Sequence, residues 1–242
     1  MGMKKVFGWF SFKKGKKNLD GNHESDKVVV DEFTYSGLYE DIVKEAFSDN
    51  SENGRIISNA FSVGCRCYND GDNKNALLVF GEMHNKLEVS KEKSIVEFFM
   101  GLCHQELGNI EDAISLYKSA LEYDDSCIEI LNNLGVLLLD NGNTLEALKY
   151  LEHAVSLEDA SEYEYVNLAN AYLDMGSYDD AIKYAFKAID MNESIVLAYE
   201  ILTLAYSALE KREESMKYFN ICVENKCEDI AILSELISQE VA

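Results

Sequence analysis

Proline is missing from all 242 residues of the chain, and long apolar runs are missing too. Proteins built from β-strands and many loops usually recruit proline into their turns, so its absence favours an all-helical chain. A membrane-spanning helix needs about 18 or more consecutive apolar residues, and the sequence has no such run. Because 47% of the residues are hydrophobic, the chain still has enough apolar surface to fold around a core.

Basic residues are scarce outside the N-terminus. Lysine and arginine number 22 against 44 aspartates and glutamates, a net charge of −22. Six of the lysines lie in residues 1–17, which contain no acidic residue, so residues 18–242 carry a net charge of −28. Such an acidic body repels phosphate backbones, which argues against nucleic acid as a partner and leaves basic or neutral protein surfaces open.

Cysteine and histidine lack the spacing that metal sites and catalytic centres need. The six cysteines include no Cys-x-x-Cys pair and have no histidine at ligand spacing. The four histidines share no face that would pair them with a nucleophile. We therefore expect free thiols in a reducing cytoplasmic compartment, no cofactor or metal, and a protein that is not an enzyme.

A period of 34 residues runs through most of the sequence. Apolar residues recur at spacings of three and four on either side of a break, which predicts two antiparallel helices in each unit. In the first helix, an aliphatic residue precedes a small one: Val63-Gly64, Met100-Gly101, Leu134-Gly135, Leu168-Ala169 and Leu202-Thr203. Twelve residues after the small residue stand Ala76, Ala113, Ala147, Ala181 and Ser215. Small residues in these columns allow the two helices to approach closely.

The break between the two helices carries a glycine in four units: Gly71, Gly108, Gly142 and Gly176. Glycine there supplies the left-handed residue that ends the first helix, whereas the fifth unit has Glu210. The residues that follow can cap the second helix: Asp72, Asn109, Asn143 and Ser177. Three capping boxes are predicted to begin first helices: Ser94-x-x-Glu97, Ser126-x-x-Glu129 and Ser161-x-x-Glu164.

These columns resemble the tetratricopeptide repeat (TPR), whose pattern is a large residue, Leu-Gly, Tyr, then Ala, Phe, Ala and Pro. The unit from Ile128 to Ser161 carries the pattern best, with Leu131, Leu134-Gly135, Ala147, Leu151 and Ala154. The sequence departs from the pattern at the proline, where it has Glu88, Asp125, Asp159, Glu193 and Cys227. The resemblance implies an all-α fold, an α-solenoid of TPR helix-turn-helix repeats that forms a right-handed superhelix.

The period divides the chain into five expected repeats and several flanking segments. The repeats are 57–93, 94–127, 128–161, 162–195 and 196–229, followed by a C-terminal capping helix at 230–242. Residues 36–50 read as a degenerate half repeat, because Tyr39 to Phe47 lines up with Tyr178 to Phe186. Residues 18–35 are expected to be a linker, and residues 1–17 a basic aromatic tail.

The resemblance implies a protein–protein interaction scaffold that binds a peptide or protein segment in its concave groove. In the family, the second, fifth, ninth, twelfth and thirteenth residues of a repeat face that groove. Asn133 and Asn167 stand at the sixth position of consecutive repeats, where amides either hold a peptide backbone or bond to neighbouring helices. Without lysine or arginine, the expected groove suits a basic or neutral partner. The expected partner-binding residues are Phe61, Tyr68, Phe98, Gln105, Glu129, Asn132, Asn133, Asp140, Tyr163, Asn167, Asn170 and Asp174.

Residues 1–17 alternate lysine pairs with aromatic residues, including Trp9, the only tryptophan. One interpretation is a segment that lies on an anionic membrane surface, which would make the chain a membrane-associated TPR assembly factor at the inner face of a membrane. A second is a disordered tail. A third is that the segment occupies the acidic groove, in cis or within a homo-oligomer, with Trp9 as its anchor.

Overall fold

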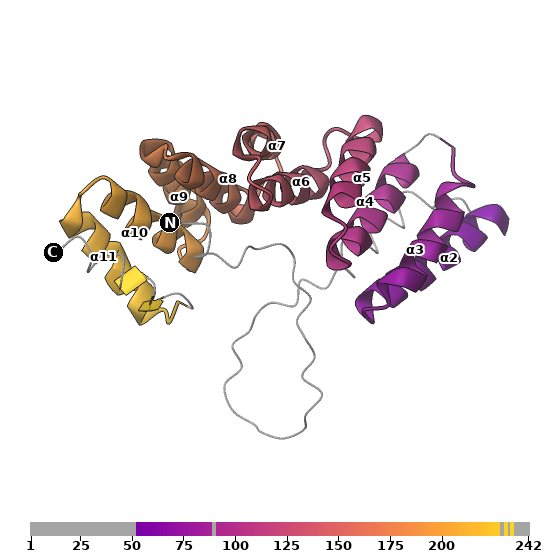
Figure 1. Ribbon diagram of the computed structural model, residues 1–242, viewed down its shortest axis with the longest axis horizontal. Helices are drawn as coiled ribbons and strands as arrows, with labels where there is room; N and C mark the ends of the chain where they lie inside the picture. The colour runs from indigo at the N-terminus through magenta and orange to yellow at the C-terminus, as the bar shows by residue number, and fades with distance from the viewer. Residues whose placement is uncertain (1–51, 89–90, 228–229, 232, 235–242) are drawn as a thin grey trace, which may run out of the picture. The chain divides into compact units, whose positions relative to one another are not determined.

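The structure is a computed structural model that describes residues 52–88, 91–227, 230–231 and 233–234. Over these residues the chain is all-α, and ten helices follow one another as antiparallel pairs (Figure 1). The pairs are α2 (Glu52–Asn69) with α3 (Asn73–His84), α4 (Lys91–Glu106) with α5 (Ile110–Tyr123), α6 (Ile128–Asp140) with α7 (Thr144–Ser156), α8 (Glu162–Met175) with α9 (Tyr178–Met191), and α10 (Val196–Ala208) with α11 (Arg212–Glu224).

These helices belong to two compact units, one holding α2 to α5 and the other α6 to α11. The expected tail at 1–17, linker at 18–35 and half repeat at 36–50 lie outside the described residues. Of the expected capping helix at 230–242, only residues 230–231 and 233–234 are described, and they are helical. Helix α2 begins at Glu52, five residues before the expected start of the first repeat at 57.

The two helices of a hairpin fit together by matching a small residue to a large one. A Cβ atom added to Gly101 of α4 would lie 2.4 Å from the ring of Tyr117 on α5, and one added to Gly135 would lie 2.6 Å from Leu151. Gly64 faces Phe80 in the same way, at 2.5 Å. Because real Cβ atoms do not approach so closely, only glycine allows these hairpins to close around their large partner.

The four turn glycines have the left-handed conformation that the sequence predicts, with φ between 79° and 84°. In the first hairpin, the amide of Gly71 donates to the Tyr68 carbonyl, and the amide of Asp72 donates to the Cys67 carbonyl. The fifth hairpin keeps the same turn without glycine: Glu210 has φ 58°, and the Lys211 amide donates to the Tyr206 carbonyl at 2.9 Å. The backbone geometry of the turn is therefore retained although its glycine is lost.

The helix caps agree with the sequence only in part. Ser161 and Glu164 form the expected capping box at α8. The box expected at Ser94 is wrong, because α4 begins at Lys91 and Ser94 lies buried inside the helix, where its Oγ donates to the Ala120 carbonyl. The box expected at Ser126 is wrong as well, since the residue at the N-cap of α6 is Cys127.

The residues expected to cap the second helices do stand at their N-cap positions. Only Asp72 makes the bond, its carboxylate accepting from the Asn75 amide. Asn109, Asn143 and Ser177 make no side-chain cap bond. Position in the repeat is thus a better guide to a helix boundary than to the hydrogen bond made there.

Candidate protein-interaction surface

The first helix of each hairpin has a face that points away from its partner helix. In α6, Gly135 faces Leu151 of α7, so the neighbouring Val136 lies about 100° further around the helix. Residues at the second, fifth, ninth, twelfth and thirteenth positions of the repeats share this side. We call it, for α6, α8 and α10, the inner face. Its members are Glu129, Asn132, Val136, Leu139, Asp140, Tyr163, Val166, Asn170, Leu173, Asp174, Leu197, Glu200, Leu204, Ser207 and Ala208.

The inner face has a buried centre and an acidic border. At the ninth position Val136, Asn170 and Leu204 are only 3%, 7% and 3% exposed. Toward the border, Asp140 and Asp174 are exposed, and Glu129 is half-buried. None of the fifteen side chains is lysine or arginine, so the face presents negative charge around an apolar and amide centre.

The asparagines of α6 and α8 bond to each other and to their own helix. Asn167 Nδ2 donates to Asn132 Oδ1 at 2.8 Å, which links consecutive repeats. Asn133 Nδ2 donates to the Glu129 carbonyl one turn earlier, at 2.7 Å. All three side chains are buried. Of the two alternatives for these amides, the structure contains the bonds to helices, and their contact with a partner stays a prediction.

In the other unit, the expected groove aromatics lie inside an aromatic cluster. Phe61 packs edge-on against Phe99 with ring centroids 5.2 Å apart, and Tyr68 meets the same ring at 6.3 Å. Phe98 packs on Tyr117 at 5.7 Å. All three rings are buried, because bulky aromatics are stabilised by burial and here fill the space between helices, so their contact with a partner stays a prediction.

Gln105, Asp174 and Tyr163 complete the set of expected site residues. Gln105 is half-buried and accepts a hydrogen bond from the Tyr117 hydroxyl at 3.0 Å. Asp174 accepts from Thr144 Oγ1 at 2.6 Å, which ties α8 to the start of α7. Tyr163 remains exposed at 37%. The structure thus brings Glu129, Asp140, Tyr163 and Asp174 to the inner face with some or all of their surface accessible.

A polar pair that the sequence interpretation missed, formed by a half-buried histidine and a buried glutamate, joins the first two hairpins. His84 Nε2 lies 2.7 Å from Glu97 Oε1, and Glu97 is only 5% exposed. Its second oxygen, Oε2, is buried without a hydrogen-bond partner. Glu97 stands at the fourth position of its repeat, where the next repeats have Leu131, Tyr165 and Tyr199. An acidic residue among large apolar and aromatic ones could therefore have indicated this pair from the sequence.

A second feature that the sequence interpretation missed is a series of stacked tyrosines that join first and second helices. Tyr172 of α8 stacks on Tyr184 of α9, with centroids 5.4 Å and planes 6° apart, and 34 residues later Tyr206 stacks on Tyr218 at 5.6 Å and 9°. Lysines lie over these rings, Lys183 at 4.7 Å and Lys217 at 4.9 Å from the centroids.

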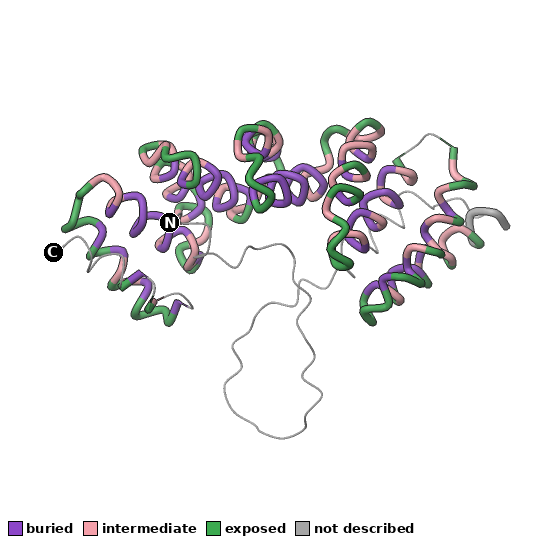
Figure 2. The backbone as a smooth tube through the Cα atoms, in the orientation of Figure 1, coloured by how far each residue is buried: buried purple, intermediate pink, exposed green. Residues whose placement is uncertain are grey.

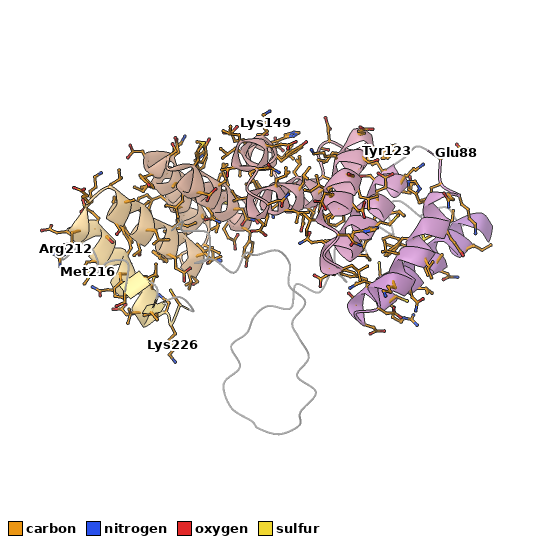
Figure 3. The ribbon with its side chains drawn as sticks, in the orientation of Figure 1. Glu88, Tyr123, Lys149, Arg212, Met216 and Lys226 are labelled. Atoms are coloured by element: carbon orange, nitrogen blue, oxygen red, sulfur yellow. The ribbon has the colours of Figure 1, made fainter. Side chains whose placement is uncertain are left out.

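The signal for these stacks was the recurrence of Lys183-Tyr184 as Lys217-Tyr218 at the repeat spacing, in a column that also holds Lys149-Tyr150. Lys149 points away from α6 on the outer side of its hairpin (Figure 3). The lysine column therefore belongs to the second helices and leaves the inner face without positive charge. Burial and the hydrogen bond that it donates to Glu152 raise the pKa of Tyr172, which keeps its hydroxyl protonated.

Three of the described cysteines are poorly reactive. Burial raises the pKa of the Cys65, Cys222 and Cys227 thiols, which makes them weak nucleophiles. Within residues 52–88, 91–227 and the short stretches described after them, no three histidine, cysteine or acidic side chains lie together as metal ligands would. No helix of these segments is long and apolar enough to cross a membrane.

Repeated hairpins of this kind define a class, the helical repeat proteins. Two family models agree with that class, both described as tetratricopeptide repeat, one matching residues 100–163 and the other residues 163–195. The chain is a tetratricopeptide repeat protein. Proteins of this family generally mediate protein–protein interactions and are usually non-catalytic.

Solved structures of similar fold come from several bacteria. A MamA protein is 24% identical over 72% of this chain and 93% of its own, with a TM-score of 0.64. A tetratricopeptide repeat protein from Parabacteroides merdae is 18% identical over 76% and 75% of the two chains, with a TM-score of 0.68. Pseudomonas aeruginosa PilF is 16% identical over 72% and 78%, with a TM-score of 0.63. No curated protein sequence matches the chain.

Proposed function

We propose that the chain is a scaffold that binds a basic or neutral peptide segment of a partner protein along the inner face of α6, α8 and α10. The observation that supports this proposal is the charge pattern of the face, where Glu129, Asp140 and Asp174 border an apolar centre without any lysine or arginine. Carboxylates form strong charge-assisted hydrogen bonds with arginine and lysine. Aliphatic side chains at the centre would hold the apolar residues of the same segment.

The asparagines are not proposed to bind the peptide directly. Asn132 and Asn167 hold α6 and α8 in register through their mutual hydrogen bond, so they act on the partner by positioning the two helices. The residues proposed to contact the partner are the accessible ones at the border, Glu129, Asp140, Tyr163 and Asp174. Exposed charges at the border of an interface mainly affect the rate of association and its dependence on salt.

Peptide selection from a random display library, with the full-length protein as bait, tests the proposal. We expect enrichment of peptides that combine lysine or arginine with aromatic or aliphatic residues. Reversal of two border charges, Glu129→Lys with Asp174→Lys, should weaken a selected peptide about tenfold, which is about 1.4 kcal/mol. Affinity is measured by the anisotropy of the labelled peptide.

The matched control reverses two exposed acids on the second helices, Asp190→Lys with Glu224→Lys. The control changes the net charge by the same amount but leaves the inner face intact, so its affinity should stay close to that of the unmodified protein. Acidic peptides in the selection, or equal losses in the two variants, would count against the inner face as the binding surface.

A further inference from the structure

We propose that residues 1–17 of the chain occupy the inner face of α6, α8 and α10 in cis. This inference rests on the same surface as the proposed function, and it makes the N-terminal segment an internal competitor of the partner peptide. Three observations support it: the burial of the face, the chemistry of the segment, and the length of chain that connects the two.

The centre of the inner face is almost fully buried. Among those helices, α8 packs with its hairpin partner α9 and with its neighbours α7, α10 and α6. On the inner face of α8, Asn170 and Leu173 are only 7% and 4% exposed. Figure 2 likewise shows α6 and α8 buried along most of their length, whereas α7 and α9 carry many exposed residues. A segment that lies over the face would add to the burial that the packing of α8 against α6, α7, α9 and α10 already gives.

The chemistry of residues 1–17 matches the face. The segment has Val6, Phe7, Trp9, Phe10 and Phe12 for the apolar centre. Its six lysines, without any acid, complement the border carboxylates. Aromatic rings supply much apolar contact area for each residue that becomes ordered. The segment therefore has the composition that the proposed function requires of a partner.

The remaining candidates within the chain have the wrong charge. Residues 18–51 contain nine acidic residues and only two lysines, and residues 235–242 contain two acidic residues and no base. Both would be repelled by Glu129, Asp140 and Asp174. Residues 18–51 also supply length, since 34 residues span up to about 110 Å when extended. The connection therefore sets no tight limit on how far from α2 residues 1–17 can lie.

Trp9 reports on the segment alone, because it is the only tryptophan in the chain. In the full-length protein at low salt, we expect its emission to be blue-shifted and protected from quenching by acrylamide. Glu129→Lys with Asp174→Lys should shift the emission to the red, and the control Asp190→Lys with Glu224→Lys should leave it unchanged. Lys4→Glu with Lys5→Glu should give the same red shift, and it changes no residue of the helical units, so unfolding cannot mimic the result.

Further outcomes of the same measurement distinguish binding of the segment in cis from binding to a second copy of the chain or to a membrane. An emission that is independent of protein concentration supports occupation in cis, whereas a red shift on dilution would assign the segment to the face of a second copy and overturn the proposal. Emission of a freely quenched indole, unaffected by salt or by either pair of substitutions, would also overturn it. So would a Trp9 that is exposed in the protein alone and becomes buried only when anionic lipid vesicles are added.

Competition with the partner peptide separates this inference from the proposed function. If the segment covers the face in about nine molecules of ten, releasing it by Lys4→Glu with Lys5→Glu raises the affinity for a selected peptide about tenfold. If no peptide is selected while Trp9 is protected, the inference holds and the proposed function fails. If peptides bind but Lys4→Glu with Lys5→Glu leaves their affinity unchanged, the function holds and internal competition is wrong.

Discussion

At the scale of single residues, one residue of the first helix faces one residue of the second helix in each hairpin, and the sizes of these two side chains are matched. Glycine faces Phe80, Tyr117 or Leu151 in the first three hairpins. In the fourth, Ala169 and Ala185 occupy the corresponding positions, and both are fully buried. In the fifth, Thr203 takes the place of glycine, and Phe219 at the large position is only half-buried. A larger first residue is thus accompanied by a smaller or less buried second one.

The glycine of the second hairpin gives a direct test of this matching. Gly101→Ala places a methyl group 2.4 Å from the Tyr117 ring, so we expect a loss of about 1–3 kcal/mol in the free energy of unfolding despite the better helix propensity of alanine. The control is Gly81→Ala on α3, where no atom lies within 4 Å of the new methyl group. That substitution should stabilise by up to about 1 kcal/mol. Urea unfolding followed by circular dichroism measures both, and equal effects would show that the contact does not limit the hairpin.

The turn of the fifth hairpin offers the opposite test, because Glu210 has φ 58°. A side chain in the left-handed region costs about 1–2 kcal/mol, so Glu210→Gly should raise the free energy of unfolding by about 1 kcal/mol. The reciprocal change is Gly108→Ala at φ 79°, where space is free and only the backbone opposes the methyl group. It should destabilise by about the same amount, and thermal melts of the two variants should move in opposite directions.

At the scale of helices, the 34-residue period of the sequence predicted local features such as turns. It did not predict features that depend on contacts between hairpins. The turn at Gly142 follows from one residue in one place, and the structure confirms it. The cap at Ser94 failed because α4 begins three residues earlier, at Lys91. The bond between Asn132 and Asn167 joins side chains 35 positions apart, and its partner choice depends on how two hairpins pack. For the same reason a family position could not reveal that Phe61 and Tyr68 are buried.

The His84–Glu97 pair is a contact between hairpins whose value can be measured. His84→Leu removes the partner of a buried carboxylate, and we expect a loss of about 3 kcal/mol in the stability of the unit that holds α2 to α5. The double change His84→Leu with Glu97→Leu replaces both polar partners by apolar residues, in keeping with the large residues that the other repeats have in place of Glu97. It should recover most of the loss, because well-packed apolar residues often replace a buried ion pair without cost. A double variant as unstable as the single one would mean that the pair is needed for packing.

At the scale of the whole molecule, the net charge of −22 acts on every helix at once. Like charges destabilise a compact state, and salt screens them over a Debye length that falls from about 30 Å at 0.01 M to about 3 Å at 1 M. We expect the thermal midpoint of the helical units to rise with sodium chloride. Near the isoelectric point, at a pH of about 4.5, the same addition of salt should have little effect. A midpoint that falls with salt at neutral pH would indicate that attractive pairs outweigh the repulsion.

Because the side chains are matched in size within each hairpin, the hairpin is the smallest segment that can be duplicated, deleted or exchanged without disturbing this contact. A whole hairpin carries both members of its size-matched pair, so duplicating, deleting or transplanting 34 residues keeps each small residue beside its own partner. An exchange of one helix between hairpins would instead place the glycine of α4 against Ala185, leaving a void, or Ala169 against Tyr117, forcing a clash. Recombination is therefore tolerated at the connections between hairpins and opposed at the turn within one.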